Sequence, residues 1–168
     1  MVLKPSKKEL CFLARSLGEE LLSRGARLAC AESCTGGWIS KVITDVPGSS
    51  SWFGWGLVTY ANDAKKEIFG ISEELLSEHG AVSKSVVIAM AKGVKQMASA
   101  EFSVAVSGIA GPDGGTDEKP VGTVWFAYGS PQRVQTDCRH FDGDRESVRR
   151  QSVMHALMRL SEIVRQAD

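Results

Sequence analysis

The chain has 168 residues, enough to bury one sizeable hydrophobic core and too few for two ordinary domains, so we expect a single domain over residues 1–168. Lysine plus arginine and aspartate plus glutamate each number 20, and this balance gives no overall field that favours nucleic acids or membrane surfaces. The first ten residues lack the apolar core of a signal peptide, and no segment approaches the ~20 apolar residues that span a bilayer. We therefore expect a cytoplasmic protein that binds neither nucleic acid nor membrane.

The sequence offers no recognisable metal site. No C-x-x-C pair occurs among the 4 cysteines, and the 3 histidines show no ligand spacing. The ordinary interpretation of these cysteines is reduced, partly buried thiols. We expect neither a metal nor another cofactor.

The N-terminal part of the chain predicts a helix, a strand and a second helix. A capping box at Ser6 opens the first helix, and leucines at helical spacing continue it to about Arg24. Residues 27–31 are an apolar run of strand length. Residues 32–37 then form a turn into a helix that starts near Trp38.

The next segment predicts a loop and a strand. Residues 47–51 combine proline, glycine and hydroxyl residues, which is typical of a loop. Residues 52–60 supply aromatic and β-branched strand formers, although Gly54 and Gly56 weaken that prediction.

Two helices and a buried strand follow. The first helix begins near Asn62 or Asp63, and Ser83 can cap the second, which carries one apolar stripe typical of packing against a sheet. Residues 102–107 read as a buried strand, and residues 108–115 are too rich in glycine for regular structure.

The C-terminal part predicts a hairpin and a last helix. Residues 121–128 and 133–141 are the paired strands, and the helix starts after residues 142–144. The predicted order is α-β-α-β-α-α-β-β-β-α. Such an order indicates an α/β fold of three α/β/α layers around a mixed, mostly parallel sheet. Ligands of these sheets bind at the carboxyl ends of parallel strands, where both glycine-rich loops would lie.

Ser33 is the best candidate nucleophile. A turn that follows a strand exposes its hydroxyl, and the helix that comes next offers unpaired backbone N–H groups to an oxyanion. Those donors would come from Thr35, Gly36 and Gly37. The same hydroxyl residues are also typical of a simple helix cap.

A serine needs a base, and the sequence suggests a lysine rather than a histidine. None of His79, His140 and His155 lies in a glycine-rich loop, so a Ser-His-Asp triad has no support. Burial can lower the pKa of a lysine toward neutrality, and Lys65 with Tyr60 before it fits this role. The alternative is a solvated helix face and an aromatic strand end.

A phosphate has two candidate binding elements. The loop of Ser107, Gly108, Ala110 and Gly111 could present successive N–H groups to it, or could be only a tight connection. Arg145 stands at the start of the last helix, where a cation is unfavourable without a nearby anion, and Arg149 lies one turn later. Asp142, Asp144 or Glu146 could instead pair with these arginines.

At this point the sequence resembles a known family, the C-terminal domain of the competence/damage-inducible protein CinA, which also occurs as a free-standing nicotinamide-nucleotide amidohydrolase. The resemblance covers nearly the whole chain. It is carried by four ordered blocks: residues 31–37, residues 58–62 with Lys65, residues 79–83, and residues 107–112 continuing to 119–123.

This resemblance implies a three-layer α/β/α fold and a hydrolase that converts nicotinamide mononucleotide to nicotinic acid mononucleotide and ammonia in pyridine nucleotide recycling. It implies that Ser33 is the nucleophile and that Tyr60 and Lys65 activate it. The substrate would be the small-molecule partner.

Two other functions, and the formation of a homodimer, stay open. The chain could be a nucleotide-binding module without catalysis, or an interaction domain in competence or recombination. A homodimer is plausible if the aromatic run of Trp52, Phe53 and Trp55 forms an exposed patch rather than core.

Overall fold

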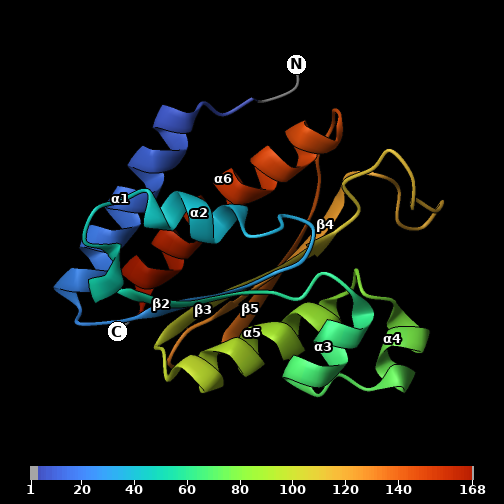
Figure 1. The fold of residues 1–168 in the computed structure, drawn as a ribbon, viewed down its shortest axis with the longest axis horizontal. Helices are drawn as coiled ribbons and strands as arrows, with labels where there is room; N and C mark the ends of the chain where they lie inside the picture. Colours follow the sequence, from blue (N-terminus) through green and yellow to red (C-terminus); the bar gives the residue numbers. More distant parts are fainter. Residues whose placement is uncertain (1–3, 168) are drawn as a thin grey trace.

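The computed structural model describes residues 4–167, which form a five-stranded sheet in the order β2-β1-β3-β4-β5 (Figure 1). The strands are β1 (Leu28–Glu32), β2 (Phe53–Val58), β3 (Phe102–Gly108), β4 (Thr123–Gly129) and β5 (Val134–His140). Strand β1 pairs in parallel with β2 and β3, whereas β4 is antiparallel to β3 and β5. Only β4 therefore opposes the common direction, and the predicted mixed, mostly parallel sheet is confirmed.

Helices cover both faces of the sheet, which gives the predicted three layers (Figure 1). On one face lie α1 (Lys7–Ser23), α2 (Trp38–Thr44) and α6 (Arg145–Gln166). On the other lie α3 (Asn62–Phe69), α4 (Glu73–His79) and α5 (Lys84–Ala98). None of these helices within residues 4–167 is long and apolar enough to cross a membrane.

The buried core is split by the sheet into two clusters. Along β1, Leu28 and Cys30 belong to the cluster under α1, α2 and α6. Ala29 and Ala31 belong to the cluster under α5. Successive side chains of a strand point to opposite faces, so the five residues of β1 contribute to both core clusters.

Two short elements were not predicted. Helix α4 has seven residues, of which only Leu76 is buried, so it lacks an apolar stripe; the side chain of Ser72 accepts a hydrogen bond from the Leu75 N–H as its cap. A 3-10 turn, η1 (Ser49–Ser51), occupies part of the segment predicted as a loop. Apart from these additions, the elements follow the predicted order.

The aromatic run considered as a dimer patch divides between core and surface. Trp52 is 2% exposed, and Phe53 packs partly buried against the same core cluster. Trp55 is 41% exposed on the edge strand β2. Trp52 is therefore core, and homodimerisation stays a prediction.

Candidate active site

Ser33 lies directly after β1, in the turn that leads to α2. Its backbone N–H donates to the carbonyl of Val106 in β3, which continues the parallel pairing one residue past the strand. The turn needs glycine because Gly36 has φ +60° and Gly37 has φ +91°. Ser33 thus sits at the carboxyl ends of two neighbouring parallel strands, as the sequence predicts.

A buried carboxylate holds this turn in place. The two oxygens of Glu32 accept five hydrogen bonds, from the Thr35 and Ser40 hydroxyls and from three backbone N–H groups at the start of α2. The side chain is fully buried. Glu32 therefore caps a helix whose own N-cap residue, Gly37, has no side chain to do so.

Lys65 reaches the reactive hydroxyl from α3. Its Nζ lies 3.2 Å from Ser33 Oγ, and it donates to the carbonyls of Thr59 at 2.7 Å and Tyr60 at 3.0 Å. The side chain is only 1% exposed. All three acceptors are neutral, and burial lowers the pKa of Lys65 below its ordinary value of 10.5.

These side chains face a common cavity of about 190 Å³. It is lined by Ser33, Cys34, Tyr60, Asn62, Lys65, Ala81, Val82, Ser107, Gly108, Ala110 and Arg145. No histidine lines it. His155, the one histidine with a short carboxylate contact, lies in a different cavity with its ring nitrogen 2.6 Å from Asp137.

Tyr60 contributes to the cavity in two ways. Its carbonyl accepts from Lys65, whereas its hydroxyl accepts from Arg145 Nη2 at 2.8 Å. A second nitrogen of Arg145 donates to the carbonyl of Gly111 at 2.7 Å. Arg145 therefore links the tyrosine to the second glycine-rich loop, and no carboxylate of residues 4–167 pairs with it.

The expected oxyanion donors need a correction. The Gly36 N–H donates to the Ser33 carbonyl, and the Gly37 N–H donates to Glu32. The Thr35 hydroxyl also donates to Glu32, at 2.6 Å. The two glycines are therefore required by the shape of the turn, and their N–H groups are already used within it.

The second glycine-rich loop is also partly engaged. The Ser107 hydroxyl donates to the Ala81 carbonyl, and a β-carbon at Gly108 would lie 2.7 Å from Val124, so little room remains at that position. Ala110 lines the cavity, and Gly111 adopts φ +83°. Of this loop, Ser107, Gly108 and Ala110 line the cavity, whereas a β-carbon at Gly111 would lie 2.5 Å from Val121.

Comparisons with known proteins identify the family of this chain. A family model described as the CinA C-terminal domain matches residues 11–164. The chain belongs to this family. A protein named nicotinamide-nucleotide amidohydrolase PncC from Escherichia coli (strain K12) is 52% identical over 155 residues, covering 90% of this chain and 93% of that protein. Another of the same name from Pseudomonas putida is 55% identical over 145 residues, covering 86% and 91%.

The fold of this CinA C-terminal domain also matches solved structures. The competence damage-inducible protein A (ComA) from Klebsiella pneumoniae subsp. pneumoniae MGH 78578 superposes with a TM-score of 0.91 at 36% identity. The match covers 95% of this chain and 99% of that chain. The resemblance that the four sequence blocks indicate is thereby confirmed for family and fold.

The sequence pattern does not reveal what Glu32 and Arg149 do in this CinA domain. It places Glu32 only within the turn, although an acidic residue directly before the candidate serine is a usable signal. It predicts Arg149 as part of a possible phosphate clamp, but the guanidinium donates to the carbonyls of Cys34 and Thr35, both at 3.0 Å. It fastens the nucleophile turn to α6.

Cys34 is the neighbouring rival nucleophile. Burial raises the pKa of its thiol to about 12, so it is a neutral thiol near pH 7. A neutral thiol is a poor nucleophile. Ser33 with Lys65 is therefore the better reactive pair in this cavity.

Proposed function

We propose that this protein hydrolyses the carboxamide of nicotinamide mononucleotide to a carboxylate and ammonia. The observation that carries the proposal is the 3.2 Å contact between Lys65 Nζ and Ser33 Oγ inside a small cavity. A serine beside a buried amine is a nucleophile with its base within hydrogen-bond reach. The substrate class comes from the amidohydrolase names of the close relatives.

Lys65 is the general base in this proposal. Its neighbours are neutral carbonyls and a hydroxyl, and burial favours the uncharged amine. The neutral amine takes the proton of Ser33 as the hydroxyl oxygen attacks the carboxamide carbon. The Tyr60 carbonyl accepts a hydrogen bond from Lys65 and orients its amine, whereas the Tyr60 hydroxyl binds Arg145 and does not contact Lys65.

We assign the oxyanion to the N–H groups of Cys34 and Thr35. Both groups lie near the Cys34 sulfur, since they help to lower the pKa of that thiol against the larger effect of burial. They follow Ser33 directly in the chain, and the N–H groups of Gly36 and Gly37 are occupied. Fixed donors of this kind stabilise charge that develops in the transition state.

The intermediate collapses with proton return from Lys65. The carbon–nitrogen bond breaks, the leaving nitrogen takes the proton from the Lys65 ammonium, and ammonia departs. An ester between Ser33 and the pyridine carboxyl remains. Water attacks this ester with Lys65 again as base, which releases the acid and restores the serine hydroxyl.

The nucleotide fits the cavity in one direction. A cavity of about 190 Å³ accommodates the pyridine ring and its carboxamide but not the whole nucleotide. Ribose and phosphate must therefore extend outward, past the rim where Arg145 and the backbone after Gly108 lie. The cation of Arg145 is available to the phosphate because only neutral groups bind it.

Ammonia release from nicotinamide mononucleotide tests the proposal with paired variants. Ser33→Ala and Lys65→Met should each lower kcat by roughly 10³-fold or more while substrate binding persists. The matched controls are Ser50→Ala and Lys66→Met, which alter an exposed serine and the partly exposed lysine next in sequence. Binding of the nucleotide without any ammonia release by the wild-type protein would reject the hydrolase and favour a binding module.

A substrate panel tests the role of the phosphate. Nicotinamide mononucleotide should be hydrolysed with a higher kcat/KM than nicotinamide riboside, and Arg145→Gln should reduce this preference. Equal use of the two compounds by the wild-type protein would contradict the assignment of Arg145 while leaving the reaction itself standing.

A further inference from the structure

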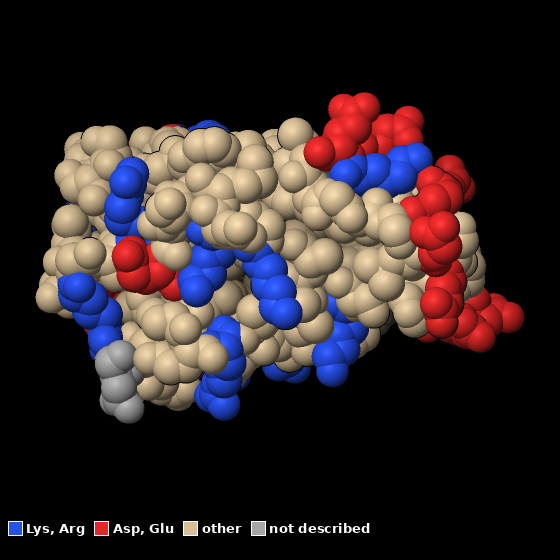
Figure 2. All heavy atoms as spheres, turned by 90° about the horizontal axis from the view of Figure 1, so that it is seen from below, with Lys and Arg blue, Asp and Glu red and all other residues tan. Residues whose placement is uncertain are grey.

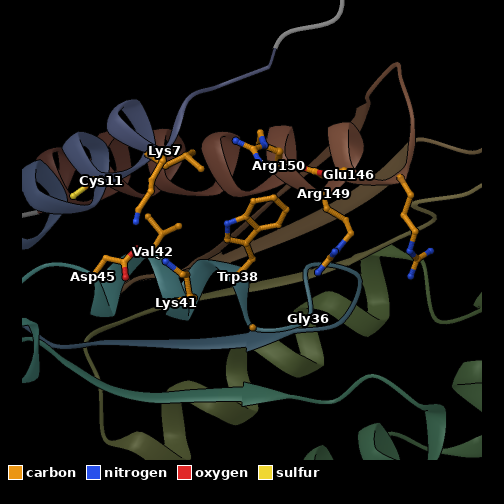
Figure 3. Close-up of a pocket in the computed structure, with 13 residues that line it drawn as sticks. Lys7, Cys11, Gly36, Trp38, Lys41, Val42, Asp45, Glu146, Arg149 and Arg150 are labelled. Carbon is orange, nitrogen blue, oxygen red and sulfur yellow. Dashed lines mark hydrogen bonds and ion pairs between the residues drawn. The ribbon is translucent and has the colours of Figure 1, made fainter.

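A second cavity of the described chain is larger than the one at Ser33. A pocket of about 710 Å³ lies between α1, α2 and α6, on the sheet face opposite Lys65 and α3 (Figure 3). Lys7, Trp38 and Arg150 reach into it from these three helices. Its volume lies in the range of sites that enclose small organic ligands.

The pocket has an apolar floor with an aromatic plane. Leu10, Cys11 and Val42 line it, together with the half-buried indole of Trp38. The guanidinium carbons of Arg149 and Arg150 lie 5.4 and 5.1 Å from the indole ring centre. Planar guanidinium groups and an indole together favour a flat aromatic ring as ligand.

The walls of the pocket carry an excess of positive charge. Five cations line it against two carboxylates: Lys7, Lys41, Arg145, Arg149 and Arg150 against Asp45 and Glu146. Asp45 pairs with Lys41 and Glu146 pairs with Arg150. No ion pair within residues 4–167 neutralises the other three cations.

Two of these cations stand where the helix dipole opposes them. Lys7 is the first residue of α1 and Arg145 is the first residue of α6. A cation in a first helical turn costs some tenths of a kcal/mol, and a bound anion removes that penalty. Glu9 and Asp144 already cap these two helices, so the positive charge of the pocket comes from the side chains rather than from the helix ends.

The zero net charge of the chain hides a separation of charge. Figure 2 shows the face covered by α3 to α5, where acidic side chains gather at the end at which α4 lies. Glu73, Glu74 and Glu78 belong to that helix. Lysines and arginines spread over the rest of that face in Figure 2, and the cationic pocket lies on the other side of the sheet, away from these glutamates.

We propose that this pocket is a second ligand site, next to the Ser33 cavity, for a nucleoside monophosphate; the two cavities share only Arg145 among their lining residues. The base would lie against Trp38 in place of the Arg150 guanidinium, which lies over the indole, and the phosphate would bind Lys7. Arg149 lies on the other side of Trp38 in Figure 3 and uses Nε and Nη2 on the carbonyls of Cys34 and Thr35. Its guanidinium carbon is 5.4 Å from the indole ring centre, so a ligand on Trp38 would lie close to the residue that fastens the Ser33 turn. The inference does not depend on the amidase reaction.

Calorimetric titration with adenosine monophosphate tests the site. Lys7→Glu should weaken binding at least about tenfold, because one unit charge is reversed close to the phosphate. The matched control is Lys8→Glu, the same change on a neighbouring residue that lines a different groove. Trp38→Leu should also weaken binding about tenfold, whereas Trp55→Leu on the β2 edge should not. Adenosine alone and inorganic phosphate alone should each bind at least about tenfold more weakly than the monophosphate.

Three results would overturn the proposal. The first is no binding of adenosine monophosphate by the wild-type protein, and the second is binding that neither Lys7→Glu nor Trp38→Leu weakens. The third is one-for-one displacement by nicotinamide mononucleotide in the Ser33→Ala variant, which would place the ligand in the substrate site. Sedimentation of the same samples tests whether a second copy of the chain fills the pocket instead. If the wild-type protein binds no nucleotide and forms an oligomer that Lys7→Glu dissociates, the ligand site is rejected.

Discussion

Replacing Glu32 with glutamine should destabilise the fold and slow the reaction, although the two side chains have the same shape. Five donors converge on the Glu32 carboxylate. Glutamine keeps one acceptor oxygen and presents an NH₂ group in place of the other. The best arrangement keeps the oxygen toward Thr35, Gly37 and Ile39, which together supply three of the donors.

The NH₂ group then meets Ser40. The Ser40 hydroxyl can rotate and accept, but the Ser40 N–H, now 2.8 Å from a carboxylate oxygen, would face another donor. An unsatisfied buried donor costs about 1–3 kcal/mol, and the remaining bonds lose the strengthening that the charge provides. We expect Glu32→Gln to lower the free energy of unfolding by about 2–4 kcal/mol, or the melting temperature by roughly 4–16 °C.

Urea denaturation and ammonia release measure the two effects. Glu67→Gln is the matched control, because Glu67 is an exposed carboxylate on α3; it should change the free energy of unfolding by less than about 0.5 kcal/mol. The Glu32 variant should also lose turnover at temperatures where it is fully folded, since the turn that carries Ser33 loosens. Equal stability of the two variants would refute the view that Glu32 holds the turn.

Three other outcomes are expected. The free energy of unfolding should rise with pH between the lowered pKa of Lys65 and its ordinary value of 10.5, because in this range the unfolded chain binds one more proton than the folded chain. Urea titrations at several pH values measure this slope, and Lys65→Met should remove it. A slope that Lys65→Met leaves unchanged would contradict a lowered pKa. Gly36→Ala should lower both stability and activity, because the added β-carbon would lie 3.2 Å from Arg149. The control Gly25→Ala, at a similar φ of +59° with nothing within 4 Å, should lower stability by only about 1 kcal/mol. Equal losses of activity in the two variants would argue against a contact between residue 36 and Arg149. His155→Ala should retain kcat within about twofold, since this residue lies outside the Ser33 cavity, and a large loss of kcat would revive a histidine base.

The residues that bear local signals were predictable. Glycines after a strand indicate a turn, and a hydroxyl within it indicates either a nucleophile or a cap, so Ser33 was within reach of sequence reasoning. Lys65 was predictable as a base because burial can lower the pKa of a lysine toward neutrality. Lys65 and Ser33 are 32 positions apart in the sequence, and the parallel pairing of β1 with β2 brings the ends of the two strands, and so the two residues, together.

The contacts that stabilise the turn were beyond such reasoning. Arg149 reaches Cys34 across 115 positions, and nothing in the spacing of the arginines distinguishes this contact from a phosphate clamp. The direction of the Tyr60 hydroxyl, toward Arg145 rather than Lys65, likewise depends on where α6 begins. Both the Arg149 contact and the direction of the Tyr60 hydroxyl depend on packing between residues far apart in the sequence.

The order of Glu32 and Ser33 in the chain keeps the buried Glu32 carboxylate, next to the proposed nucleophile, away from the proposed base Lys65. Side chains of β1 alternate between the two core clusters, and Glu32 follows Leu28 and Cys30 toward α2, where it is saturated by donors. Ser33, one residue later, meets Lys65 from α3 on the opposite face. A carboxylate on the Lys65 side would hold the ammonium protonated and raise its pKa. Because the alternation sends the carboxylate to the other face, burial is the dominant influence on the amine and lowers its pKa, which is what a general base requires.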